Sequence, residues 1–195
     1  MDLISRVKGI LLNPKQEWQT ISGETTTMAE LYKSYIVILA AIGPVASIIG
    51  MSIIGISMPL AGSFRIPIGS SLTSAIIQYV LTLAGVYVLA LVIDALAPTF
   101  SGEKNINQAF KVAAYSYTPG WLVGIFMVIP ALGMLGILGL YGLYILYLGL
   151  PLLMKAPQEK SMGYTAAVII VGIVIFAVIG VISHTFISYP MPRIQ

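Results

Sequence analysis

A stripe of polar and small residues runs along the second long apolar stretch of the chain. Its members recur at intervals of three and four residues, so they share one face of a helix: Ser71, Ser74, Gln78, Thr82 and Gly85. An amide such as that of Gln78 is costly in hydrocarbon unless it has a partner. The stripe is therefore expected to face protein or water. It would either line a polar pathway or join helices, and we favour joining helices because Ser, Thr and Gln commonly do so in membranes.

A second polar pattern is a tyrosine ladder. Tyr141, Tyr144, Tyr147 and Pro151 fall on one face of the predicted helix. Such a ladder could line a pore, relay protons or contact a ligand. Buried tyrosines more often hydrogen-bond their neighbours or lie at a membrane interface. We favour this structural role.

Three prolines lie inside apolar stretches, where kinks are expected: Pro44, Pro119 and Pro151. Each leaves the carbonyl four residues earlier without its helical donor, and for Pro119 this is the carbonyl of Tyr115. Such carbonyls coordinate ions in some transporters, although neighbouring helices usually satisfy them. With no acid nearby, an ion site is not favoured.

Asp94 is the one acid within an apolar stretch, near its predicted cytoplasmic end. A proton-coupling acid is expected at mid-depth in the membrane. We therefore expect an interfacial ion pair of Asp94 with one of three lysines. These are Lys104, Lys111 and Lys155.

Groups for catalysis or metal binding are scarce. The chain has no cysteine and one histidine, His184, which is expected at the outer boundary near Tyr189. A single histidine cannot furnish a metal site. No HExxH, GxSxG or P-loop motif occurs, and the acids are scattered. We expect no catalytic residue, no metal, no cofactor and no enzymatic activity.

The elements that position these residues are long apolar stretches. Hydrophobic residues make up 58% of the 195-residue chain and charged residues 9%, against roughly 25% charged in soluble domains. About 20 apolar residues suffice to cross a bilayer. Five stretches qualify: 35–58, 69–97, 109–129, 132–154 and 164–187. The third and fourth would form one kinked crossing in a four-span alternative, which we disfavour because Pro130 lies near their middle.

The predicted fold is all-α, a bundle of five transmembrane helices. Residues 1–33 form an amphipathic cytoplasmic segment, residues 34–188 the membrane domain and residues 189–195 a short extracytoplasmic tail. Eight of the ten lysines and arginines then fall on one side, which the positive-inside rule makes cytoplasmic. The basic residues form no run or aromatic-rich face, so no nucleic-acid partner is expected.

The N-terminal segment predicts two short helices and the start of the first span. Its helix-start signals are Asn13 with Pro14 and Thr27 with Glu30. A further signal of this kind, Asn105 with Gln108, precedes the third span. The first helix is amphipathic and Trp18 follows it, so we assign these residues to a membrane interface: Leu3, Arg6, Val7, Lys8, Ile10, Leu11 and Trp18. This face would rest on lipid or pack against the cytoplasmic ends of the bundle. The pattern favours neither.

Small residues predict close helix packing. Gly43, Ser47 and Gly50 share a face of the first span, and Gly120 with Gly124 forms a GxxxG motif in the third.

Two segments resemble the membrane domain of the Yip1 family. They are AAYSYTPGWLVGIF, with Tyr115, Tyr117 and Pro119, and YGLYILYLGLPLLMKAPQEKS, with the tyrosine ladder and Pro151. The resemblance implies five spans, a cytoplasmic N-terminus and, for a compact bacterial-type member, the inner membrane. Eukaryotic relatives work with Rab-type GTPases through a long N-terminal region. The corresponding segment here is short, so GTPase binding is not inferred.

Two functions follow from these patterns. The first is a non-enzymatic membrane organiser or adaptor, whose partners are membrane lipids, other membrane proteins or further copies of itself. The second is a transporter or channel for a small solute, ion or lipid along the Gln78 stripe and the tyrosine ladder. The first is slightly favoured.

Overall fold

The computed structural model describes residues 2–58 and 62–186. Two short helices, α1 (Leu3–Leu12) and α2 (Pro14–Ser22), form an N-terminal hairpin. The carboxylate of Asp2 caps α1 by accepting from the Ser5 amide. Pro14 begins α2 as predicted, but the side chain of Asn13 makes no capping hydrogen bond.

The first long helix is built from five pieces. These are α3 (Met28–Leu31), the π-helix η1 (Tyr32–Ile36), α4 (Val37–Ala40), α5 (Ile42–Ile48) and the π-helix η2 (Ile49–Ile54). The predicted capping box of Thr27 and Glu30 is present and begins the helix at Met28. The break at Ala41 precedes Pro44, as expected of an internal proline. A short antiparallel pair follows, β1 (Ile56–Met58) and β2 (Gly62–Phe64), which the all-α prediction did not include.

The second long helix is α6 (Ile68–Leu96), continued by the 3₁₀ turn η3 (Ala97–Phe100). Next come α7 (Ile106–Ser116), α8 (Thr118–Val123) and the 3₁₀ segment η4 (Gly124–Val128). The chain then forms η5 (Pro130–Leu140, 3₁₀) and α9 (Tyr141–Leu153). The last described elements are η6 (Gln158–Lys160, 3₁₀) and α10 (Ser161–Phe186). The Asn105 cap is present, and α9 runs through Pro151 without interruption.

Among the described residues, four helices are long and apolar enough to cross a membrane. They are Met28–Ile54, Ile68–Phe100, Pro130–Leu153 and Gln158–Ile175. The predicted stretch 109–129 is helical but interrupted at Tyr117, two residues before Pro119. The mainly helical class is therefore confirmed, whereas the number of five spans is not.

The chain reverses at Pro130. Ile129 has an extended backbone, and α8 packs against η5 beyond the turn. A Cβ added to Gly139 would lie 3.3 Å from the Cα of Gly120. The segments before and after Pro130 are therefore neighbours folded back on each other, not one continuous kinked helix.

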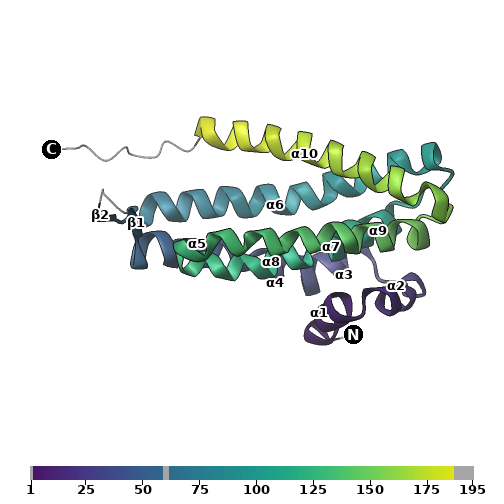
Figure 1. Cartoon of the computed structure of the whole chain (residues 1–195), viewed down its shortest axis with the longest axis horizontal. Coiled ribbons are helices and arrows are strands. Elements are labelled where there is room, and N and C mark those ends of the chain that lie inside the picture. Colours follow the sequence, from purple (N-terminus) through teal and green to yellow (C-terminus); the bar gives the residue numbers. More distant parts are fainter. Residues whose placement is uncertain (1, 59–61, 187–195) are drawn as a thin grey trace.

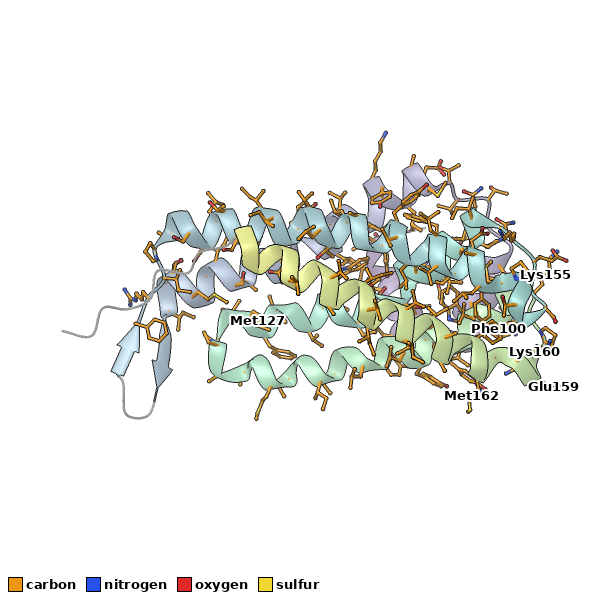
Figure 2. All side chains as sticks on the ribbon, turned by 90° about the horizontal axis from the view of Figure 1, so that it is seen from above. Phe100, Met127, Lys155, Glu159, Lys160 and Met162 are labelled. Carbon is orange, nitrogen blue, oxygen red and sulfur yellow. The ribbon has the colours of Figure 1, made fainter. Side chains whose placement is uncertain are left out.

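The long helices run side by side, and the hairpin of α1 and α2 lies against their flank (Figure 1). The pair β1 and β2 is at one end of the bundle. Lys155, Glu159 and Lys160 gather at the opposite end, and Met127 lies toward the β1 and β2 end (Figure 2). The buried core connects the hairpin to the bundle, because it includes Ile10 and Trp18 as well as Phe110 and Tyr164.

Candidate functional site: the junction of hairpin and bundle

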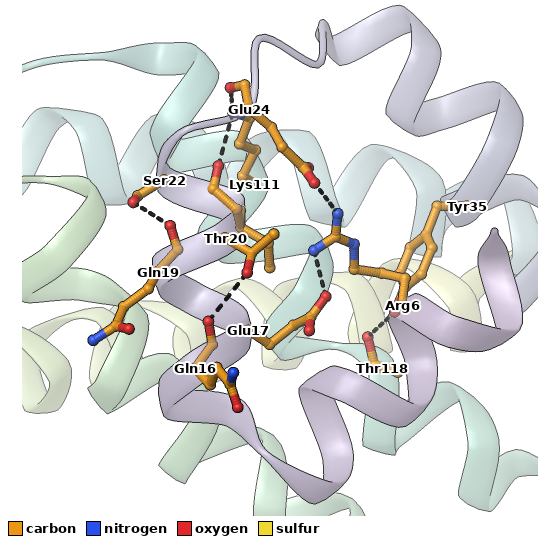
Figure 3. Close-up of polar contacts among 11 residues, drawn as sticks. Arg6, Gln16, Glu17, Gln19, Thr20, Ser22, Glu24, Tyr35, Lys111 and Thr118 are labelled. Atoms are coloured by element: carbon orange, nitrogen blue, oxygen red, sulfur yellow. Dashed lines mark hydrogen bonds and ion pairs between the residues drawn. The ribbon is translucent and has the colours of Figure 1, made fainter. Parts of the chain in front are cut away.

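The most concentrated polar chemistry lies where the N-terminal hairpin meets the bundle. Arg6 of α1 is 3% exposed. Its Nη1 donates to Oε1 of Glu17 on α2 at 2.5 Å, and its Nη2 donates to Oε1 of Glu24 after α2 (Figure 3). A buried charge is tolerated when it is paired and hydrogen-bonded. These two ion pairs therefore fix the angle between α1 and α2.

Lys111 attaches this hairpin to α7. Its side chain is buried, and its Nζ donates to the backbone carbonyls of Glu24 at 2.5 Å and Ile21 at 3.4 Å. These carbonyls lie at and just beyond the end of α2, where unpaired carbonyls favour a nearby cation. Lys111 was expected as one of three possible partners of Asp94 and instead joins α7 to the hairpin.

Aromatic rings continue the junction into the bundle. The Arg6 guanidinium lies over the ring of Tyr115, 5.4 Å from its centroid. Tyr35 meets the same ring edge-on at 5.0 Å, and its hydroxyl shares a 2.7 Å hydrogen bond with Oγ1 of Thr118. The first span thus contacts the Tyr115 to Pro119 segment beneath α1, through Tyr35.

Trp18 anchors α2 on α9. Its ring is 1% exposed, and its Nε1 donates to the carbonyl of Ile145 at 3.0 Å. Gly149 makes this approach possible, since a Cβ there would lie 2.6 Å from the Trp18 ring. Trp18 is thus buried in protein, although the sequence assigned it to the membrane interface.

A half-open cavity of about 730 Å³ lies between α1, the loop after α2 and η1. Its wall includes Arg6, Glu24, Thr27, Glu30, Tyr35 and Tyr115. Both carboxylates already have partners, because Glu24 binds Arg6 and Glu30 completes the capping box with Thr27. The described residues contain no group of three metal-ligating acids or histidines. The arrangement is suited to holding the hairpin in place.

Comparison with known proteins identifies the family. A model described as the Yip1 domain matches residues 8–179. The chain belongs to the Yip1 family. It is 26% identical over 180 residues to the inner membrane protein YohC of Escherichia coli K12, covering 90% of this chain and 92% of the relative. The YohC of Escherichia coli O6:H1 gives the same values. No solved structure is significantly similar to the chain.

The Yip1 match contains most of the junction. Glu17, Trp18, Lys111 and Tyr115 lie inside it, whereas Arg6 lies just before its first residue. The Tyr115 to Pro119 segment, which carried the resemblance, forms part of the floor beneath α1. Its Tyr117 stacks on Trp121 at 5.7 Å, and Pro119 is buried.

In this Yip1 chain the residues of the polar stripe on α6 lie in different environments, some buried and some exposed. Ser71 is buried and accepts a 2.7 Å hydrogen bond from Ser52 of η2, which joins two helices. Ser74 is partly buried, and Thr82 donates to the carbonyl of Gln78 within its own helix. The side chain of Gln78 is exposed.

The tyrosine ladder contacts the hairpin through its first member. The hydroxyl of Tyr141 donates to the carbonyl of Leu11 in α1 at 3.0 Å. Tyr144 is exposed and contacts the Tyr141 ring, while Tyr147 and Pro151 are partly buried. The cavity described above borders neither Gln78 nor this ladder.

The expected ion pairs of Asp94 do not form. Lys155 pairs with Glu103 at 2.6 Å, and Lys111 donates to the hairpin. Lys104 is exposed and has no ion pair within the described residues. Oδ1 of Asp94 is buried and has no hydrogen-bond partner among the described residues. The prediction for Asp94 was wrong, because Lys111 and Lys155 have other partners and Lys104 makes no ion pair within the described residues.

The N-terminal helix packs on protein along its inner side. Arg6 and Ile10 are buried, and Leu3, Val7 and Leu11 pack against the core, whereas Lys8 is exposed. Of the two alternatives, the packed one therefore holds for this face. The side chain of His184 and the whole of Tyr189 lie outside the described residues.

Sequence reasoning missed several residues of the junction: Glu17, Glu24, Tyr35, Lys111 and Thr118. Arg6 and Glu17 are separated by a turn between two helices, so no helical period connects them. The one available signal was the concentration of acids in the N-terminal segment, because four of the seven acids of the chain lie in residues 1–33 together with Arg6.

Proposed function

We propose that this Yip1-family chain is a non-enzymatic organiser or adaptor of the inner membrane. The supporting observation is the hairpin, which is held on the bundle by Lys111, by Trp18 and by the contact of Arg6 with the Tyr115 ring. A docked hairpin presents a fixed surface, and a fixed surface lowers the entropy cost of binding a partner. The inner membrane is proposed because YohC, which matches over 90% of this chain, is named an inner membrane protein.

The proposed topology has five crossings, with a cytoplasmic N-terminus and an extracytoplasmic C-terminus. Its third crossing is the interrupted segment formed by α7, α8 and η4. With 11, 6 and 5 residues in these helices, the segment is about 36 Å long, enough for about 30 Å of hydrocarbon. The distribution of lysine and arginine supports the same orientation.

Transport has less support. A pathway along Gln78 and the tyrosine ladder needs these groups to border one cavity. Gln78 is exposed on α6, whereas Tyr141 contacts α1 and the described cavity lies beneath the hairpin.

Photo-crosslinking in cells tests the adaptor role. A photoreactive residue at Gln19, which is exposed on α2, should give discrete crosslinks to a membrane protein or a second copy. These should weaken in the Trp18→Ala variant, because α2 loses its anchor. A probe at the exposed lipid-facing residue Ile173 is the matched control. No discrete crosslink from Gln19, or solute flux in proteoliposomes that Gln78→Leu abolishes, would contradict the proposal.

A further inference from the structure

The outer side of α1 has an amphipathic face that the bundle does not cover. Ile4 and Leu12 are 59% and 73% exposed. Lys8 lies between them and is exposed too. At about 100° per residue these three fall within about 80° of one another, opposite Arg6 and Ile10. We propose that this outer face of α1 docks on the anionic phospholipid headgroups of the cytoplasmic leaflet.

The height of α1 along the bundle supports a lipid partner. The hydroxyl of Tyr141 binds the carbonyl of Leu11, and Tyr141 is the first of the 13 residues of α9. The contact therefore lies about 18 Å from the C-terminal end of α9 at Leu153, which is the cytoplasmic end in the proposed topology. The hairpin lies beside the helices and not beyond their ends (Figure 1).

The long helices extend past the hydrocarbon. The 29 residues of α6 are about 44 Å long, whereas the hydrocarbon core is about 30 Å thick. With the cytoplasmic N-terminus of the proposed function, on which this inference rests, α1 lies near the level where acyl chains meet headgroups. Interfacial helices bury their apolar side chains at this depth.

The charges complete the match to anionic lipid. Lys8 and Lys15 are exposed and have no ion pair within the described residues. The acids of the hairpin do not neutralise these lysines, because Glu17 and Glu24 bind Arg6 and Asp2 caps α1. Each lysine near an anionic surface strengthens association roughly fivefold. An anionic lipid surface therefore fits this face better than a basic or neutral partner surface would.

Spin labels can measure the depth of this face in the full-length protein. The natural chain has no cysteine, so Ile4→Cys, Leu12→Cys and Lys104→Cys each give one labelling position. Lys104 is exposed in the loop after η3 and serves as the control. Each variant is reconstituted in vesicles of phosphatidylethanolamine with phosphatidylglycerol and in vesicles of phosphatidylcholine alone.

In the anionic vesicles, labels at positions 4 and 12 should collide readily with oxygen and little with a water-soluble nickel complex. The label at position 104 should do the opposite. Adding Lys8→Gln and Lys15→Gln, or removing anionic lipid, should raise nickel accessibility at position 12 several-fold. Nickel accessibility at positions 4 and 12 equal to that at 104 would overturn the proposal.

A second outcome would also overturn it. Spin–spin broadening at position 12 that disappears on dilution with unlabelled protein would show that another copy covers the face. The crosslinking from Gln19 in cells is a separate readout, so loss of lipid contact and loss of the adaptor role can be distinguished.

Discussion

Arg6 shows how a buried charge can define the position of a whole segment. Its guanidinium has two carboxylate partners and the ring of Tyr115 beneath it. Removing one member of a buried ion pair leaves the other charge without compensation, which costs about 3–5 kcal/mol. The stability of the hairpin should therefore depend on Arg6 far more than on the exposed lysines around it.

We predict that Arg6→Gln loosens the hairpin. Losing about 3 kcal/mol of docking free energy should speed amide hydrogen exchange in α2 roughly a hundredfold. Lys33→Gln is the matched control, because substituting an exposed lysine without an ion pair among the described residues changes stability by less than about 0.5 kcal/mol. Adding Glu17→Gln to Arg6→Gln should recover part of the protection, since a neutral amide needs no counter-charge. Equal exchange in the two single variants would contradict the role of Arg6.

At the scale of single residues, the sequence could predict that a polar side chain needs a partner, but not which residue that partner is. Ser71 joins helices as favoured, because a serine in an apolar helix needs a hydrogen-bond partner. The partners of Arg6 and Lys111 could not be predicted, because they depend on how two separate helices cross. Asp94 was misassigned for the same reason.

Contacts between whole helices depend on a few close approaches. Gly149 of α9 admits Trp18 of α2, and a Cβ at Gly124 would lie 2.8 Å from the Cα of Gly43. The predicted GxxxG motif thus makes its closest contact with the first span through Gly124. Gly120, the other glycine of that motif, has nothing within 4 Å of an added Cβ.

Gly149→Ala should weaken the docking of α2 on α9. The new methyl group would overlap the Trp18 ring, and such overpacking costs about 1–3 kcal/mol. The melting temperature in detergent should fall by several degrees, and the Trp18 fluorescence should shift to the red in a Trp121→Phe background. Gly120→Ala adds a methyl group in open space and should leave both unchanged or raise stability slightly. Identical behaviour of the two variants would refute this account of the contact.

Helix positions could be predicted closely from hydropathy, whereas only two of the three internal prolines, Pro44 and Pro119, correctly predicted an interruption. The second stretch was predicted at 69–97, and α6 spans Ile68–Leu96. The first helix begins at Met28, seven residues before the predicted span, because the capping box starts it among polar residues. Pro119 explains the break at Tyr117, whereas Pro151 is accommodated within α9.

At the scale of the whole molecule, the N-terminal hairpin and the bundle share one buried core. Composition and apolar length predicted a multi-spanning membrane protein. Two tyrosine-containing segments carried the resemblance to the Yip1 family, and the family match confirms it. The position of the hairpin on the flank of the bundle had no sequence signal, because an amphipathic helix fits lipid and protein equally well. The central claim is therefore that the hairpin is a fixed part of the bundle in a membrane.

A distance measurement between the two parts tests this claim most directly. Spin labels at Gln16→Cys on α2 and Lys104→Cys in the loop after η3, both exposed sites, can be measured by pulsed electron paramagnetic resonance in proteoliposomes. A docked hairpin should give one narrow distance distribution, which broadens when Arg6→Gln is added and persists when Lys33→Gln is added instead. A broad distribution in the protein with native Arg6 would contradict a docked hairpin.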